Sequence, residues 1–306
     1  MKFFASILSV ILFTALTSLN ISAQNADKYT GTLLWKISGN GLSSPSYILG
    51  THHLAHVSFV DQITGLKEAM ETTEQTVGEL VMSDQSAMQT KIQQSAMMPA
   101  GETYQTLLSA DDYAKLDVGL IDVLGAGLGQ LGSLKPGMIS MLYTITLYTK
   151  IYPEFNPMSH EAIDAYVQRI AKEKGKPVQG LETVDDQIYA LFDAEPLKVQ
   201  AESLVCAVGQ REKAKEQLDK LNDLYNKGDL KGMYSMAFNN PDDECKTSQK
   251  QQDALNKDRN DKWILKLSGI MKDKSSLVAV GALHLAGEEG ILNQLAKLGY
   301  KVEPVK

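Results

Sequence analysis

The sequence predicts an α/β fold, with a central mixed sheet formed by strands from both ends of the chain and a largely helical middle region. Two observations support this prediction. Apolar runs that end at glycine lie near both termini, and such runs are typical of buried strands that meet a loop. The long stretch between them has apolar residues at helical spacing instead.

The first predicted elements are two strands at residues 32–38 and 46–49, separated by the turn signal Gly39-Asn40-Gly41. Residues 61–75 have helical spacing, and their first residue, an aspartate, is a candidate N-cap. Residues 76–82 form the next predicted strand. A strand–helix–strand unit favours parallel strands, so we expect the second and third strands to be parallel.

Helical spacing predominates in the middle of the chain, from about residue 83 to 171 and from about 185 to 272. A short strand at 176–181 separates these two inserts. The chain closes with a strand at 277–281, a helix at about 288–298 and a strand at 301–305. We expect residues 24–306 to form a single domain.

Residues 1–23 are predicted to be a secretory signal, because Lys2 gives a positive start, an apolar stretch follows, and Ala23 suits cleavage. No later segment is long and apolar enough to predict a membrane helix. The chain has 30 basic and 37 acidic residues without a basic run, so nucleic acid is not an expected partner. We therefore expect a periplasmic or secreted protein with no membrane span in its mature chain.

Cys206 and Cys245 are the only cysteines of the chain. In an exported protein two cysteines are expected to pair, and this pair would close a loop of about 40 residues. Two free thiols are the alternative.

Two segments far apart in the sequence share the pattern Gly-x-x-His-Leu, and each follows an apolar run. They place His53 and His284 just past strand ends, where open α/β sheets form ligand crevices. Two imidazoles in one crevice would suit metal binding or proton transfer. The alternative is a pair of loop histidines that bond backbone groups. His52 is expected to face away from His53, since neighbouring residues of an extended segment alternate.

Three charged residues are further candidates. Glu79 interrupts an apolar strand, where a buried carboxylate needs a cation or donor; an outward position on an edge strand is the alternative. Glu182 follows a strand and could ligate, act as a base, or cap the next helix with Thr183. Arg259 could hold an oxyanion, although a charge run such as its own is usually a solvated helix face. His160 and Asp164 have helical spacing, for which a helix start is the commoner use.

Taken together, these motifs resemble the TraB/GumN family, whose relatives include the TIKI proteases. The match extends over nearly the whole mature length. Its motifs are Leu34-Trp35-Lys36-Ile37, Gly50-Thr51-His52-His53, Glu79, Gly180-Leu181-Glu182-Thr183 with Gln187, Arg259-Asn260 with Trp263, and Gly281-Ala282-Leu283-His284-Leu285. The sequence departs from the family at His52, where an apolar residue is common, and the Gly-x-x-His spacing favours His53 as the functional residue.

The resemblance implies a fold similar to the erythromycin esterase (EreA) and ChaN-like group, and a metal-dependent peptidase. We expect a divalent metal, Mn²⁺, Co²⁺ or Zn²⁺, bound by His53, Glu79 and His284. Glu182 would act as general base and Arg259 would stabilise the developing oxyanion. The expected partner is a peptide or a small-molecule substrate.

Two alternatives stay open. The chain could bind a peptide or haem without turnover, since TraB-like relatives are linked to the inhibition of peptide pheromones and the ChaN-like group to haem. It could also be a metal-free esterase in which the histidines act as bases. Fold similarity alone does not choose among these functions.

Overall fold

The structure is a computed structural model that describes residues 29–82, 85–157, 159–240, 244–245 and 247–306. The predicted secretory signal at residues 1–23 lies outside the described residues. The predicted fold class is confirmed, because strands from both ends of the chain form one mixed sheet and helices fill the middle of the sequence. The prediction that residues 24–306 form a single domain stays a prediction.

The sheet has six strands in the order β4-β3-β5-β2-β1-β6. Their bounds are β1 Leu34–Ser38, β2 Ser46–Thr51, β3 Gln75–Gly78, β4 Val178–Gly180, β5 Ser276–Gly281 and β6 Lys301–Pro304. The strands β4, β3, β5 and β2 are parallel to one another, while β1 is antiparallel to both β2 and β6. The second and third strands are therefore parallel as predicted, but β5 lies between them.

The central position of β5 determines which strand ends lie next to one another. All six residues of β5 are buried, as expected for a strand covered on both faces. Gly281 pairs with Thr51 of β2, and Ala279 pairs with Gly78 of β3. The carboxyl ends of three parallel strands thus meet at one edge of the sheet, although they come from distant parts of the sequence.

The segment between β2 and β3 differs from the predicted helix at residues 61–75. Asp61 lies within a 3-10 helix, η2 (Val57–Gln62), and the α-helix α1 (Leu66–Thr72) begins only after Gly65. The prediction that Asp61 is an N-cap is wrong. Gly65 has φ of 77°, and a Cβ there would lie 2.4 Å from Cγ1 of Val305, so the entry into α1 requires glycine.

Six helices lie between β3 and β4 in the part of the chain that the structure describes. They are α2 (Gln85–Ser95), α3 (Tyr104–Leu107), α4 (Ala110–Leu124), α5 (Leu128–Leu131), α6 (Pro136–Ile151) and α7 (Ile163–Glu173). Ser109 caps α4 by accepting from the backbone N–H of Asp112. The helix α7 packs against β3, β4 and β5, which brings its side chains close to the carboxyl edge of the sheet.

Nine helical segments of the described residues lie between β4 and β5, and two of them are π-helices. They are α8 (Val184–Ile188), the π-helix η3 (Tyr189–Asp193), α9 (Leu197–Gly209), η4 (Arg211–Lys213), α10 (Ala214–Asn226), α11 (Leu230–Phe238), α12 (Gln249–Gln252), the π-helix η5 (Asp253–Lys257) and α13 (Asp258–Asp273). The 3-10 turn η6 (Ala282–His284) and α14 (Ile291–Lys297) follow β5. The segment η5 continues directly into α13, which carries Arg259.

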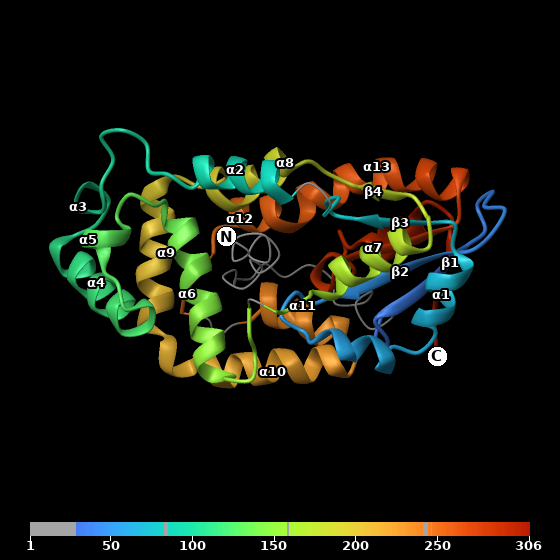
Figure 1. The fold of residues 1–306 in the computed structure, drawn as a ribbon, viewed down its shortest axis with the longest axis horizontal. Helices are drawn as coiled ribbons and strands as arrows, with labels where there is room; N and C mark the ends of the chain where they lie inside the picture. Colours follow the sequence, from blue (N-terminus) through green and yellow to red (C-terminus); the bar gives the residue numbers. More distant parts are fainter. Residues whose placement is uncertain (1–28, 83–84, 158, 241–243, 246) are drawn as a thin grey trace.

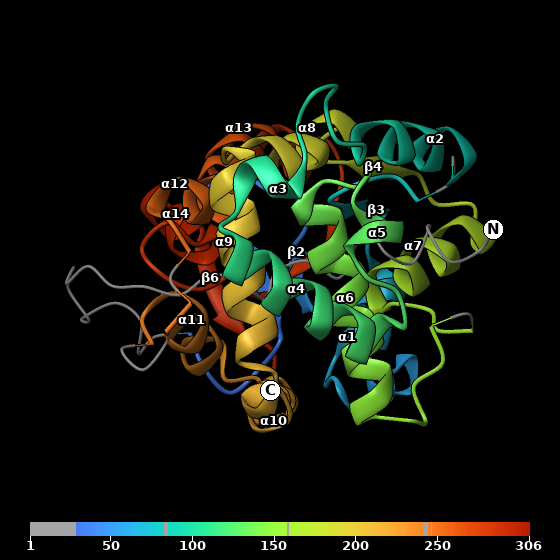
Figure 2. The ribbon, with the colours of Figure 1, turned by 90° about the vertical axis from the view of Figure 1, so that its left-hand side faces the viewer.

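The sheet lies at one end of the molecule and a group of helices at the other (Figure 1), and the described residues form four hydrophobic clusters. The sheet, α1, α7 and α13 surround the main hydrophobic core, which contains the buried residues of β1, β2 and β5. The helices α3, α4, α5, α6 and α9 lie on the opposite side and enclose a core of their own. Figure 2 views the molecule from this helical side, with α4 and α6 in front of the sheet.

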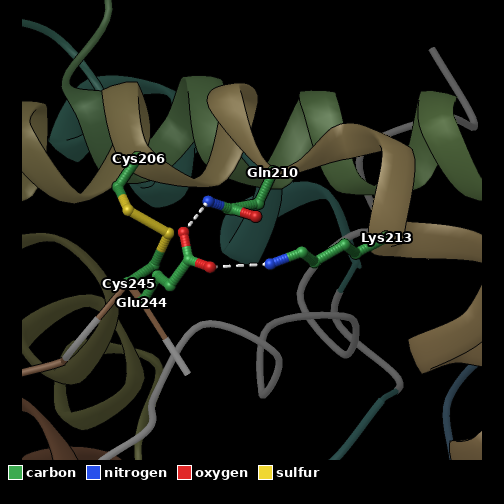
Figure 3. Close-up of a disulfide and its surroundings, with 5 residues drawn as sticks. All are labelled: Cys206, Gln210, Lys213, Glu244 and Cys245. Atoms are coloured by element: carbon green, nitrogen blue, oxygen red, sulfur yellow. Dashed lines mark hydrogen bonds and ion pairs between the residues drawn. A yellow bond between two sulfur atoms is a disulfide. The ribbon is translucent and has the colours of Figure 1, made fainter. Parts of the chain in front are cut away.

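A disulfide joins Cys206 of α9 to Cys245, as predicted, and excludes the alternative of two free thiols (Figure 3). The two cysteines are 39 residues apart in sequence. Closing a loop of this length stabilises the folded chain by about 3–4 kcal/mol in the chain-entropy description. The bond ties α9 to the segment that leads into α12, η5 and α13.

Among the helices of the described residues, none combines the length and the apolar composition that a membrane span requires.

Candidate functional site

The predicted site residues lie at the carboxyl edge of the parallel strands. His53 follows β2, Glu79 follows β3, Glu182 follows β4 and His284 follows β5. Glu79 was expected inside a strand, but β3 ends at Gly78, so its side chain lies in the crevice region rather than within the sheet. The fifth candidate, Arg259, enters from the first turn of α13.

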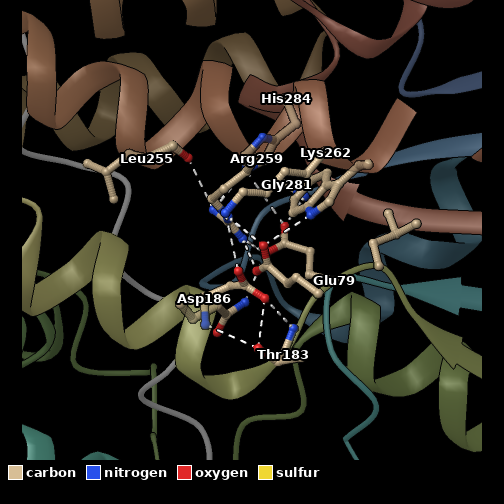
Figure 4. Close-up of polar contacts among 12 residues, drawn as sticks. Glu79, Thr183, Asp186, Leu255, Arg259, Lys262, Gly281 and His284 are labelled. Atoms are coloured by element: carbon tan, nitrogen blue, oxygen red, sulfur yellow. Dashed lines mark hydrogen bonds and ion pairs between the residues drawn. The ribbon is translucent and has the colours of Figure 1, made fainter. Parts of the chain in front are cut away.

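Arg259 is the centre of this cluster, and all five of its N–H groups are engaged (Figure 4). Nε and Nη2 donate to the two oxygens of Glu182 at 3.0 and 2.7 Å, and Nη2 also donates to Glu79 at 2.5 Å. Nη1 donates to the carbonyl oxygen of Leu255 and to Nε2 of His284, both at 3.1 Å. The alternative of a solvated helix face is wrong for Arg259, which is buried.

Glu182 is buried, and its carboxylate accepts three hydrogen bonds. Besides the two bonds from Arg259, it accepts a 3.0 Å bond from the indole N–H of Trp263, and its side chain is 3% exposed. Burial raises the pKa of Glu182, and the guanidinium of Arg259 only partly opposes this. Glu182 does not cap the next helix, because the N-cap of α8 is its neighbour Thr183.

Glu79 is the more accessible carboxylate, with a side chain that is 11% exposed. It accepts from the backbone N–H of Gly281 at 2.8 Å and from the amide of Gln187 at 3.3 Å. Burial alone would raise the pKa of Glu79, but the charge of Arg259, followed by the imidazoles of His284 and His53 in their protonated forms, lowers it to about 2. Glu79 is therefore an ionised hydrogen-bond acceptor at neutral pH.

His284 is buried beneath this carboxylate. Its Nε2 lies 4.0 Å from Oε1 of Glu79, and its ring packs against Trp263 with centroids 4.5 Å apart. Its Nδ1 lies 2.7 Å from the side-chain oxygen of Asn260. Burial and the Arg259 guanidinium lower the pKa of His284 to about 3, so the ring is neutral at physiological pH.

His53 is the most exposed of these ionisable side chains, at 17%. Its Nδ1 lies 3.5 Å from Oδ2 of Asp164, a residue of α7, and its backbone oxygen contacts Nε2 of His160 at 2.6 Å. Burial disfavours the charged imidazole, but the carboxylates of Asp164 and Glu79 outweigh burial and raise the pKa of His53. Its charge acts on Glu79 and on His284, so the three groups share one electrostatic site.

His52 has a separate environment. Its Nδ1 accepts from the backbone N–H of Leu54 at 3.0 Å, and its ring makes an edge contact with Tyr225. Burial and the neighbouring His53 lower the pKa of His52 to about 3. Its polar contacts are therefore made within its own loop.

The donor types of the cluster suit a divalent ion, since His53, Glu79 and His284 supply two imidazoles and one carboxylate. Asn260 and Asp164 also lie where outer partners of ligating histidines are found. However, Arg259 contacts the Nε2 atom through which His284 would ligate. Among the residues that the structure describes, no three His, Cys, Asp or Glu side chains are arranged to hold a metal ion.

Four further residues of the site were not assigned from the sequence. Asp164 and His160 were noticed only for their helical spacing, which gives no information about a contact with His53. Asn260 and Gln187 were quoted within motifs, without a role. For Asn260 and Gln187, the signal that could have identified them is their closeness in sequence to Arg259 and Glu182 within those motifs.

The fold and the site define an α/β protein whose centre combines two strand-end histidines, two carboxylates and one buried arginine. The model of the TraB/PrgY/gumN family matches residues 33–304, and the chain belongs to this family. The metalloprotease TIKI2 of Danio rerio is 24% identical over 330 aligned positions, which cover 91% of this chain and 62% of that relative. The chain thus spans less than two thirds of the relative's length. No solved structure gives a significant match.

Proposed function

We propose that this protein is an exported hydrolase that cleaves peptide bonds at the carboxyl edge of its sheet. The observation that carries the proposal is that Glu79 and His284 lie 4.0 Å apart at this edge, where His53 is close enough for its charge to act on both. The family and the relative named a metalloprotease support a hydrolytic reaction. The disulfide and the apolar segment at residues 1–23 support export to the periplasm or the cell exterior.

Three side chains have complementary roles in this proposal. Glu79 stays ionised and accepts a hydrogen bond from the attacking water, and Nε2 of His284 could accept a second one only by giving up its contact with Arg259. His53 has a raised pKa and the most exposed imidazole, so it can take up a proton and return it to the leaving amine. Asp164 holds the charged form of His53.

Arg259 and Glu182 support these groups from the buried side. Because every N–H of Arg259 is engaged, it could stabilise an oxyanion only by giving up one of its present bonds. The general-base role predicted for Glu182 stays a prediction, and its three bonds and burial favour an anchoring role for the guanidinium.

A divalent ion at this centre, Mn²⁺, Co²⁺ or Zn²⁺, would be bound by His53, Glu79 and His284. When bound, it would polarise the substrate carbonyl and lower the pKa of a bound water. His284 would then exchange its contact with Arg259 for the ion. His53 would serve as a ligand, with Asp164 as its outer partner.

A metal-free hydrolase is the second candidate, and one contact favours it. The guanidinium of Arg259 lies 3.1 Å from Nε2 of His284, the position that a metal would otherwise take. In this arrangement His53 and Asp164 form a general-base pair that needs no ion.

Incubation of the purified chain with a peptide library, read by mass spectrometry, tests the proposal. We expect new peptide termini with wild type and none with Glu79→Gln. Added Mn²⁺, Co²⁺ or Zn²⁺ that restores cleavage after treatment with a strong chelator supports the metal-dependent form. Undiminished cleavage in chelator supports the metal-free form. Peptides that bind but stay intact under every condition would contradict hydrolysis and indicate a sequestering protein.

A further inference from the structure

Asn260 is completely buried in α13, and its amide nitrogen faces oxygen atoms only. Nδ2 donates to the backbone oxygens of Glu289 at 2.9 Å and His284 at 3.2 Å, and to the side-chain oxygen of Asn256 at 3.1 Å. Rotating the amide by half a turn would place its carbonyl oxygen against these acceptors, which cannot donate. The orientation of the Asn260 amide is therefore fixed by its surroundings.

The neighbouring Asn256 supports the same orientation. Its Nδ2 donates to the backbone oxygen of Leu283 at 2.9 Å, which leaves its oxygen directed at Asn260. Both asparagines lie on the stretch where the π-helix η5 continues into α13, four residues apart and on one face. The two amides thus form a chain that ends at His284.

The oxygen of Asn260 lies 2.7 Å from Nδ1 of His284 and can only accept, so Nδ1 carries the proton. On the other side of the ring, Nη1 of Arg259 lies 3.1 Å from Nε2. A guanidinium can only donate, so Nε2 carries a lone pair. Two independent neighbours on opposite sides of the ring thus require the same tautomer.

We propose that Asn260 is a positioning residue that holds His284 as the neutral Nδ1–H tautomer, with the Nε2 lone pair on the side of Arg259 and Glu79. In this form Nε2 can accept a proton or bind an ion, but it cannot donate a hydrogen bond. The consequence for catalysis rests on the proposed hydrolytic function, whereas the tautomer itself does not.

Two-bond ¹H–¹⁵N NMR spectra of the full chain, labelled at histidine nitrogen and recorded without added metal, test the inference. His284→Gln assigns the signals of His284. We expect a protonated Nδ1 and an unprotonated Nε2 in wild type. A wild-type spectrum with the proton on Nε2, or with both nitrogens protonated at neutral pH, would overturn the inference.

Variants at Asn260 and Asn293 separate positioning from packing. Asn260→Leu removes the acceptor for Nδ1 and should give a mixture of tautomers. Asn293→Leu is the matched control, because Asn293 is also buried and donates to a loop carbonyl, that of Glu288, away from His284. An unmixed Nδ1–H tautomer in Asn260→Leu would show that Arg259 suffices and would contradict the role of Asn260.

Activity provides a second readout. Loss of an outer partner of this kind typically lowers activity or metal affinity about 10- to 100-fold. We expect such a decrease in kcat for Asn260→Leu and none for Asn293→Leu. If wild type cleaves no peptide, the proposed function fails while the NMR spectra still decide the tautomer.

Discussion

Arg259→Met is expected to destabilise the protein by about 3–5 kcal/mol, because it leaves two buried carboxylates without their cation. Glu79 and Glu182 both bond to this guanidinium, and their side chains are 11% and 3% exposed. The total stability of a folded domain is only about 5–15 kcal/mol, so this loss is a large part of it. Urea unfolding followed by circular dichroism measures the change.

Two comparisons make the Arg259 prediction specific. Arg169→Met is the matched control, since Arg169 also pairs with two carboxylates, those of Glu161 and Glu173, but is largely exposed. Exposed pairs contribute about 0–1 kcal/mol, so this control should change stability little. Adding Glu79→Gln and Glu182→Gln to Arg259→Met should recover much of the lost stability. Equal losses for the two arginine variants would contradict the buried network.

Glu79→Gln is expected to abolish peptide hydrolysis, with a decrease in kcat/KM of about 10³-fold or more. The substitution removes the accessible charge of the centre and places an amide N–H against a donor in either orientation, Nη2 of Arg259 or the backbone N–H of Gly281. Electrostatic groups at a reacting centre commonly contribute factors of 10²–10³ each. Kinetics on the peptide cleaved best in the library experiment measure the change.

Glu182→Gln distinguishes the two carboxylates. If Glu182 anchors Arg259, its substitution should lower stability more than Glu79→Gln does, and should lower kcat/KM less. Glu74→Gln is a control on the opposite end of β3, where Glu74 bonds Ser275. Full activity in Glu79→Gln together with an inactive Glu182→Gln would reverse the assignment and support Glu182 as the general base.

The position of the candidate residues could be predicted from the sequence because the ends of buried strands leave a local pattern. The apolar runs before His53 and His284 stop at glycine, and parallel strands place such ends at one edge of a sheet. What the sequence could not supply was the neighbour relation that put β5 between β2 and β3. That relation depends on long-range pairing between Thr51 and Gly281, which leaves no local pattern.

The buried network was less predictable for a different physical reason. Arg259 lies in a run of charges that is typical of a solvated helix face, and only tertiary contacts with Glu79 and Glu182 override that pattern. The contact of Asp164 with His53 likewise depends on how α7 crosses the sheet. The π-helices η3 and η5 depart from the 3.6-residue period that sequence reasoning uses.

The central claim is that His53 and His284, from opposite ends of the chain, act in one hydrolytic centre. A double-mutant cycle in kcat/KM tests it most directly, with His53→Ala, His284→Ala, the combined variant, and His56→Ala as an exposed control in the same loop. Residues that act as a unit are strongly non-additive. We predict that each single variant loses nearly all activity and that the combined variant is no worse. Losses that multiply, or a single variant with wild-type activity, would contradict a shared centre.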